Sequence, residues 1–234
     1  MKPFSRATLC LLALVVVAGC ASTEVTERQR YEGAKLARPD RIIVHDFTAD
    51  PADVPPESAF AAQIAGAMTP PPQQVALGHK LGAQVAKELV ADLRGMGLPA
   101  VLAAGQPAPR PNDIVLRGYF VSVDEGSAGG RVLVGFGAGA AELRTAVEAY
   151  QMTADGLRPL ARGEIKSGGG KLPGVVVPAA VVAATANPIG LIVGGAAKAT
   201  GEVTGSETIE GAAERTAKEI AAQLRTAAEQ QGWI

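Results

Sequence analysis

The sequence predicts an α+β domain in which a mainly antiparallel sheet of four to five strands carries two amphipathic helices on one face. Two observations support this fold class. Short runs rich in β-branched and aromatic residues are bounded by turn residues, most clearly at 114–123. Two longer segments, 75–96 and 209–227, repeat apolar residues every three to four positions, which is the period of a helix.

The N-terminus has the pattern of a lipoprotein signal peptide. Lys2 and Arg6 precede the apolar run 9–17, which is too short to span a bilayer. The run ends in Val17-Ala18-Gly19-Cys20, which is similar to the bacterial lipobox, whose cysteine becomes the acylated first residue of the mature chain. We therefore expect residues 1–19 to be removed and Cys20 to carry acyl chains such as palmitate. The alternative is ordinary secretion with Cys20 as an incidental thiol.

Residues 20–38 are polar and show no sustained period, so we expect them to form a flexible, lipid-anchored tether. Residues 39–234 are then expected to form one α+β domain. The residue after Cys20 is Ala21 and not aspartate. By resemblance to the bacterial sorting rule, this favours the outer membrane, with the domain facing the periplasm.

The elements of the domain are predicted in chain order from local patterns. The β-branched run 41–47 predicts a strand, and the proline-rich stretch 51–74 predicts a surface loop with a short helix at 57–66. An amphipathic helix is predicted at 75–96 and a strand at 98–103.

The second half of the domain is predicted in the same way. The strand at 114–123 is followed by Asp124-Glu125-Gly126, whose residue types are typical of a turn. Two extended segments, 142–153 and 157–167, flank Asp155-Gly156 and predict a hairpin. Thr204 and Glu207 fit a capping box for the final helix.

Several of these segments together resemble the bacterial envelope family designated domain of unknown function 4410. The resemblance covers roughly residues 38–234, and its most specific part is Asp124-Glu125-Gly126 followed by a glycine-rich spacer and the stretch 131–139. Other matching residues are the run 41–47, the end of the helix near Gly97-Leu98, Arg117-Gly118-Tyr119-Phe120, and Gly232-Trp233. The resemblance implies a secreted, often lipid-anchored protein without an established activity, so it transfers no catalytic residue to this chain.

Composition excludes several classes of function. With 22 Lys+Arg against 23 Asp+Glu, the chain lacks the positive charge that nucleic-acid binding requires. Cys10 and Cys20 are the only cysteines, and both precede the predicted domain, so neither a disulfide framework nor a thiolate metal site is expected. His45 and Asp46 are neighbours on a strand and point to opposite faces, while His79 is expected on an exposed helix face. We therefore predict no metal, no cofactor and no catalytic site.

The glycine-rich stretch around Gly135, Gly137 and Gly139 imitates the spacing of a dinucleotide-binding fingerprint. That mechanism requires a helix whose N-terminal amides face a pyrophosphate, and the residues that follow have an extended pattern instead. We interpret the stretch as a tight structural connection in which backbone approaches backbone.

The segment 172–197 contains no charged residue and is rich in Ala, Gly and Pro. Three interpretations stay open. It forms a helical hairpin packed on the domain and bent near Asn187-Pro188, or it is a flexible low-complexity insertion. Alternatively it inserts into the membrane or self-associates through the small residues Gly190 and Gly194.

We therefore expect a lipid-anchored envelope protein that is not an enzyme and that binds or assembles with another envelope component of unidentified kind. The alternative function is a membrane-inserting or self-associating component of a pore or transport accessory, acting through 172–197.

Overall fold

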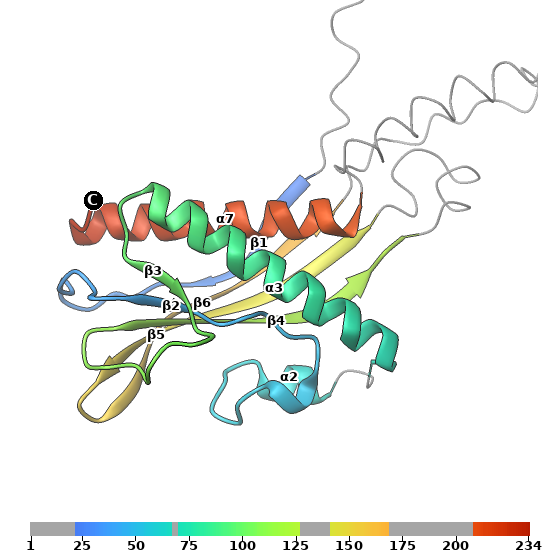
Figure 1. Ribbon diagram of the computed structural model, residues 1–234, viewed down its shortest axis with the longest axis horizontal. Coiled ribbons are helices and arrows are strands. Elements are labelled where there is room, and N and C mark those ends of the chain that lie inside the picture. Colours follow the sequence, from blue (N-terminus) through green and yellow to red (C-terminus); the bar gives the residue numbers. More distant parts are fainter. Residues whose placement is uncertain (1–21, 67–69, 127–140, 169–207) are drawn as a thin grey trace, which may run out of the picture.

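A computed structural model of the chain describes residues 22–66, 70–126, 141–168 and 208–234 (Figure 1). Its centre is a six-stranded sheet with the strand order β1-β6-β5-β4-β2-β3. The strands are β1 (Ser22–Gln29), β2 (Ile42–Val44), β3 (Ala100–Leu102), β4 (Ile114–Asp124), β5 (Glu142–Thr153) and β6 (Gly156–Gly168). The β5–β6 hairpin turns at Ala154-Asp155, with a positive φ at Gly156.

The α+β class is confirmed, but the prediction of a mainly antiparallel sheet with four to five strands is only partly right. Strand β2 pairs in parallel with both β3 and β4, while the other pairings are antiparallel, so the sheet is mixed. A long helix between β2 and β3 carries the chain back to the end of the sheet where β2 begins, so β3 runs parallel to β2. The loop 103–113 returns the chain to the same end, so β4 is parallel to β2 as well.

The additional strand is β1, and it corrects the prediction that residues 20–38 form a flexible tether. Residues 22–29 lie along β6, from Ser22 opposite Gly168 to Gln29 opposite Arg162. The following segment packs against the end of the last helix, where the Leu36 amide donates to Gln231 Oε1 at 2.7 Å. Local patterns missed the strand because β1 is an edge strand, and edge strands commonly carry polar and charged side chains.

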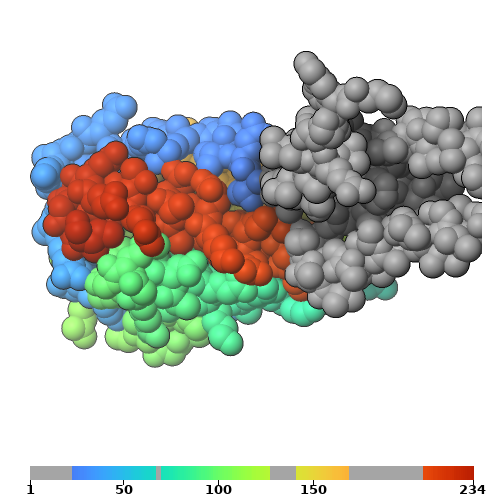
Figure 2. Space-filling view, turned by 90° about the horizontal axis from the view of Figure 1, so that it is seen from above, coloured from blue at the N-terminus to red at the C-terminus, as the bar shows by residue number. Residues whose placement is uncertain are grey.

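Two long helices lie side by side on one face of the sheet, α3 (Pro72–Gly95) and α7 (Ile209–Gln231). Figure 2, which looks onto this face, shows α7 between α3 and β1. Helix α7 is capped by Thr208, whose hydroxyl accepts a hydrogen bond from the Gly211 amide, and the capping box predicted at Thr204 and Glu207 lies outside the described residues. The helix ends at Gly232, whose φ of 76° is the left-handed conformation that glycine adopts most easily.

The opposite face carries a smaller cover made of the 3₁₀ turn η1 (Pro51–Asp53) and the short helix α2 (Ala61–Ala65). Phe60 and Ile64 pack there against Tyr119 and Ala146 of the sheet. The sheet is therefore buried on both faces where β4 passes beneath α2, with a separate small core on the side away from α3 and α7.

The chain that follows β2 passes between α3 and β4, and Phe47 lies in close contact with both elements. Phe47 is 1% exposed and packs against Phe120, with the ring centroids 6.1 Å apart. A Cβ atom at Gly82 would overlap the Phe47 carbonyl group, and one at Gly118 would overlap the Phe47 ring. Both positions must therefore lack a side chain for this crossing to exist.

A buried ion pair aligns the parallel strands where they begin. Arg41 precedes β2 and Asp113 precedes β4, and Arg41 Nη2 lies 2.5 Å from Asp113 Oδ2. The same oxygen accepts a hydrogen bond of 2.8 Å from the Arg110 amide. Burial alone would raise the pKa of Asp113, but Arg41 and the Arg110 amide outweigh it and hold that pKa below its usual value. The carboxylate therefore stays charged at neutral pH and fixes the ends of two strands.

Gly82 at the crossing predicts a loss of stability where a glycine-to-alanine substitution in a helix normally gives a gain. Gly→Ala inside a helix normally stabilises by up to about 1 kcal/mol. We expect Gly82→Ala instead to lower the free energy of unfolding by about 1–3 kcal/mol or more, because the new methyl group overlaps backbone that must move.

Gly95→Ala is the matched control in the same helix, since nothing lies within 4 Å of the Cβ position there. Urea denaturation of both variants measures the difference. A Gly82→Ala protein as stable as the Gly95→Ala protein would contradict the close crossing.

Candidate functional site

A cleft of about 390 Å³ opens where strands β2 and β3 end. His45 and Asp46 directly follow β2, and Ala103 and Ala104 directly follow β3. The carboxyl ends of parallel strands are the usual place for ligand sites in sheets with helical crossovers, and the volume is in the range of small-molecule sites. The full lining is His45, Asp46, Phe47, Thr48, Asp53, Pro55, His79, Ala103, Ala104, Arg117, Gly118 and Tyr119.

Hydrogen bonds around Thr48 hold one wall of the cleft in place. Its amide donates to the Gly118 carbonyl at 3.1 Å, and its carbonyl accepts from the Phe120 amide at 2.8 Å. Its hydroxyl donates to Asp53 Oδ2 and accepts from the Asp50 amide, both at 3.0 Å. The loop is thus tied to β4, and the Asp53 carboxylate is held at the rim.

The cleft brings together the two histidines of the chain, which are separated by 34 positions in sequence. His45 is half-buried, while His79 is exposed on α3 as expected. Burial, followed by the charge of Arg117, lowers the pKa of His45 below its usual value, and Asp46 offsets part of this. His45 is therefore neutral at pH 7, so one ring nitrogen donates a hydrogen bond and the other accepts one.

Arg117 provides the positive charge of the cleft, and the exposed Glu57 and the buried Tyr150 fix its position. Its guanidinium lies 3.2 Å from Glu57 Oε1 and 5.6 Å from the centre of the Tyr150 ring, over the ring face. Glu148, only 4% exposed, accepts a hydrogen bond of 2.8 Å from the Ala59 amide and so ties this cluster to the segment before α2.

Tyr119 belongs both to this cluster and to the cleft lining. Burial and then the Glu148 carboxylate raise the pKa of Tyr119 to about 12. Burial and a hydrogen bond with Glu148 raise the pKa of Tyr150 as well. Both phenols therefore stay protonated, and the charges in this region are those of the arginine and the carboxylates.

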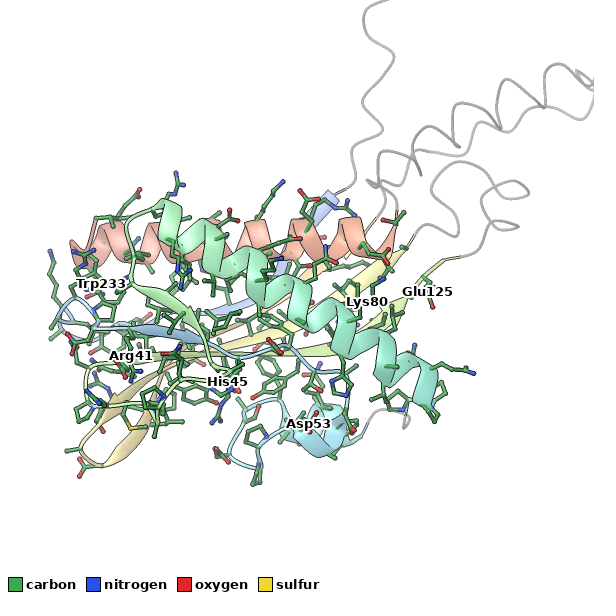
Figure 3. All side chains as sticks on the ribbon, in the orientation of Figure 1. Arg41, His45, Asp53, Lys80, Glu125 and Trp233 are labelled. Carbon is green, nitrogen blue, oxygen red and sulfur yellow. The ribbon has the colours of Figure 1, made fainter. Side chains whose placement is uncertain are left out.

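The cleft combines carboxylates at Asp46 and Asp53, imidazoles at His45 and His79, and the Arg117 guanidinium. Figure 3 shows His45 and Asp53 on the side of the sheet opposite α7. Such a set can donate and accept hydrogen bonds and can pair with a charge of either sign. Within the described ranges, no three His, Cys, Asp or Glu side chains come together in a way that could hold a metal ion.

The sequence did not indicate this cleft, because its residues come from segments that are far apart in the chain. A signal that could have indicated it is the pair Gly78 and Gly82, spaced by one helical turn on α3, which marks a close approach of other backbone. Gly78 directly precedes His79 and faces Ala49 of the loop.

Of the residues considered in the sequence analysis, His45, Asp46, His79 and Arg117-Gly118-Tyr119 line the cleft, and the others lie elsewhere. The Asp124 side chain accepts a hydrogen bond of 2.8 Å from the Gly126 amide, and Gly126 has a φ of 71°. Neither they nor Glu125 line the cleft. The signal peptide, Cys20, the glycines at 135, 137 and 139, and the segment 172–197 with Gly190 and Gly194 are outside the described residues. No helix in the described ranges combines the length and hydropathy needed to cross a membrane.

Comparison with known proteins gives one family and a weak structural likeness. The family model described as a domain of unknown function, DUF4410, matches residues 42–186. No curated protein matches the chain.

Two solved structures from Paraburkholderia phytofirmans are similar to the chain. The PelC dodecamer is 14% identical, with 64% of this chain and 85% of that chain covered and a TM-score of 0.37. A leucine-to-methionine variant of it is 16% identical, with 64% and 84% covered and a TM-score of 0.35.

The surroundings of His45 predict how it titrates. Arg117→Met should raise the pKa of His45, because one cause of its lowering is removed, while burial still holds it below the usual value. The C2 proton resonances of the two histidines, assigned with His45→Gln, follow this directly in an NMR titration.

The same shift affects stability. The folded chain binds the His45 proton more weakly than the unfolded chain, so the free energy of unfolding falls as the pH drops below about 6.5. His45→Gln should remove the share of this fall that comes from His45.

The control for the NMR titration is Arg225→Met, on the exposed side of α7, which should leave the His45 titration unchanged. Equal shifts in the two arginine variants would contradict the proposed electrostatic cause.

Proposed function

The chain belongs to the DUF4410 family, and from this premise we propose that it is a lipid-anchored bacterial envelope protein serving as a non-enzymatic binding or assembly module. Its domain faces the periplasm from the outer membrane. The observation that carries the binding role is the cleft at the ends of β2 and β3, where polar side chains from separate elements converge.

The predicted acylation site at Cys20 lies close in sequence to the start of β1. Ser22 is two residues beyond Cys20, a distance of at most about 7 Å along an extended chain. Ser22 lies beside Gly168, which lies beside Glu142 in turn. An acyl anchor on Cys20 therefore holds this end of the sheet close to the bilayer and restricts how the domain can turn.

The cleft suits a ligand or partner segment that presents both hydrogen-bond donors and acceptors. Neutral His45 offers one of each, Arg117 is charged, and the exposed carboxylates of Asp46 and Asp53 stand at the rim. Because Thr48 and the Arg117 cluster fix these groups before a partner arrives, little ordering is required on binding.

A second candidate function is membrane insertion or self-association through 172–197. Its support is the position of the residues that bracket it. Gly168 ends β6 beside Ser22, and the Thr216 hydroxyl near the start of α7 donates to Ser167 Oγ at 2.8 Å. The chain thus leaves and re-enters the described domain at the end where the anchor attaches (Figure 1).

The anchor is tested by substitution of the two cysteines. Cys20→Ala should move the protein from the membrane to the soluble fraction and abolish labelling by an alkyne analogue of palmitate. Cys10→Ala is the matched control, since that residue lies inside the signal peptide, and it should keep both properties. A Cys20→Ala protein that is still labelled and membrane-bound would remove the lipid anchor from the proposal.

The binding role is tested by site-specific photo-crosslinking in cells. A photoreactive residue at Ala104, on the exposed rim of the cleft, should give a discrete adduct, whereas one at Ala222 on the outer side of α7 should not. Arg117→Met in the Ala104 background should reduce the adduct several-fold. No adduct at Ala104, or an adduct unaffected by Arg117→Met, would count against the cleft as the binding site.

A further inference from the structure

Side chains fill the space between helix and sheet less completely beneath the C-terminal half of α7 than beneath α3. The inward side chains of α3, among them Leu81, Leu89 and Leu93, are fully buried. Below the second half of α7, by contrast, Val147 and Leu160 of the sheet and Leu224 of the helix stay partly exposed. The inward positions of α7 are largely alanines, which are too short to fill the space above the sheet.

A cavity of about 170 Å³ occupies this space. Its walls are mainly aliphatic side chains of β4, β5, β6 and α7, with Trp233 at one end. Trp233 is held there by a hydrogen bond of 3.1 Å from its indole nitrogen to the Leu36 carbonyl. An apolar cavity of about 150 Å³ in another protein binds benzene, so a space of this volume can hold about six carbons of an apolar ligand.

Three arginines line the cavity, and two of them, Arg28 and Arg30, are close enough to interact electrostatically. Arg28, at the end of β1, and Arg30, just beyond it, both line the cavity and are exposed on one side. Burial and then the charge of Arg30 lower the pKa of the Arg28 guanidinium, with Glu219 of α7 offsetting part of this. In the described part of the chain, neither guanidinium forms an ion pair, so two like charges stand together without a bound carboxylate.

We propose that this cavity binds a medium-chain fatty acid, with the hydrocarbon chain against the aliphatic walls and Trp233, and the carboxylate at Arg28 and Arg30. The charge of these two arginines selects the ligand class, since a purely apolar molecule would not use the two guanidiniums. The cavity shares no lining residue with the cleft at the ends of β2 and β3, so this is a second site that stands independently of the first.

The single tryptophan of the chain makes the binding directly measurable. The probe is octanoate that carries bromine on its last carbon, because bromine quenches indole fluorescence at short range. The protein is the chain from residue 20 onward with Cys20→Ser, which keeps every described residue and adds no acyl chain of its own. Saturable quenching that unbrominated octanoate reverses is the expected result. Quenching that rises linearly without saturation would overturn the proposal.

The arginines are tested by exchanging the head group of the ligand. Arg28→Gln with Arg30→Gln should weaken octanoate binding about tenfold, as measured by displacement of the brominated probe. The same pair of substitutions should leave the weaker binding of octanol unchanged. Equal affinities for octanoate and octanol in the unsubstituted protein would exclude carboxylate recognition and so overturn the fatty-acid assignment.

The cavity itself is tested by filling it. Ala149→Leu places extra carbon atoms among the lining residues and should abolish saturable quenching while the melting temperature stays equal or rises. Ala227→Leu, on the helical side of the same cavity, is a second filling variant in case the first unfolds. Ala222→Leu on the exposed side of α7 is the control and should bind normally. Normal binding by a folded filling variant would show that the ligand sits elsewhere.

Discussion

The passage of the chain between α3 and β4 is the constraint on which the rest of the structure depends. Phe47 enters the core there because Gly82 on the helix and Gly118 on the strand leave room for its backbone and ring. The crossing also carries the next residues, beginning with Thr48, around to the other side of β4, where they form a wall of the cleft. Close packing of the core and placement of the candidate site therefore have one cause.

The two faces of the sheet have different chemistry. The face below α3 and α7 is apolar and is filled tightly under one helix and loosely under the other. The opposite face buries charged groups, with Glu148 and Glu164 only 4% and 5% exposed. Glu164 pairs with Arg144 at 2.5 Å, whereas Glu148 accepts a hydrogen bond from the Ala59 amide through Oε1 and keeps its Oε2 buried without a partner in the described structure. The candidate cleft includes residues of this polar face, and the loosely filled face leaves an apolar cavity.

Sequence analysis located the elements whose signal is contained in a short window. In α3, β4, β5, β6 and α7, apolar residues recur at the positions that face the core. A helix or strand returns to the same face every few residues, so this pattern is visible within one segment. β1 escaped detection because it lies at the edge of the sheet and has little apolar surface to bury. Glu164 alternates with the charged residues Arg162 and Lys166 along β6 but is buried, and it pairs with Arg144 of the neighbouring strand, which no local pattern in β6 indicates.

Sequence by itself determined the α+β class, the family resemblance, the signal-peptide pattern ending at Cys20 and most element boundaries, since each of these depends on residues close together in the chain. Tertiary structure alone decided that β2 pairs in parallel on both sides, that residues 22–29 join the sheet, and that His45 and His79 line one cleft. These features depend on which distant segments meet. That is set by non-local packing, here by the space that two glycines leave for Phe47 and by the ion pair of Arg41 with Asp113, and no local period in the chain encodes it.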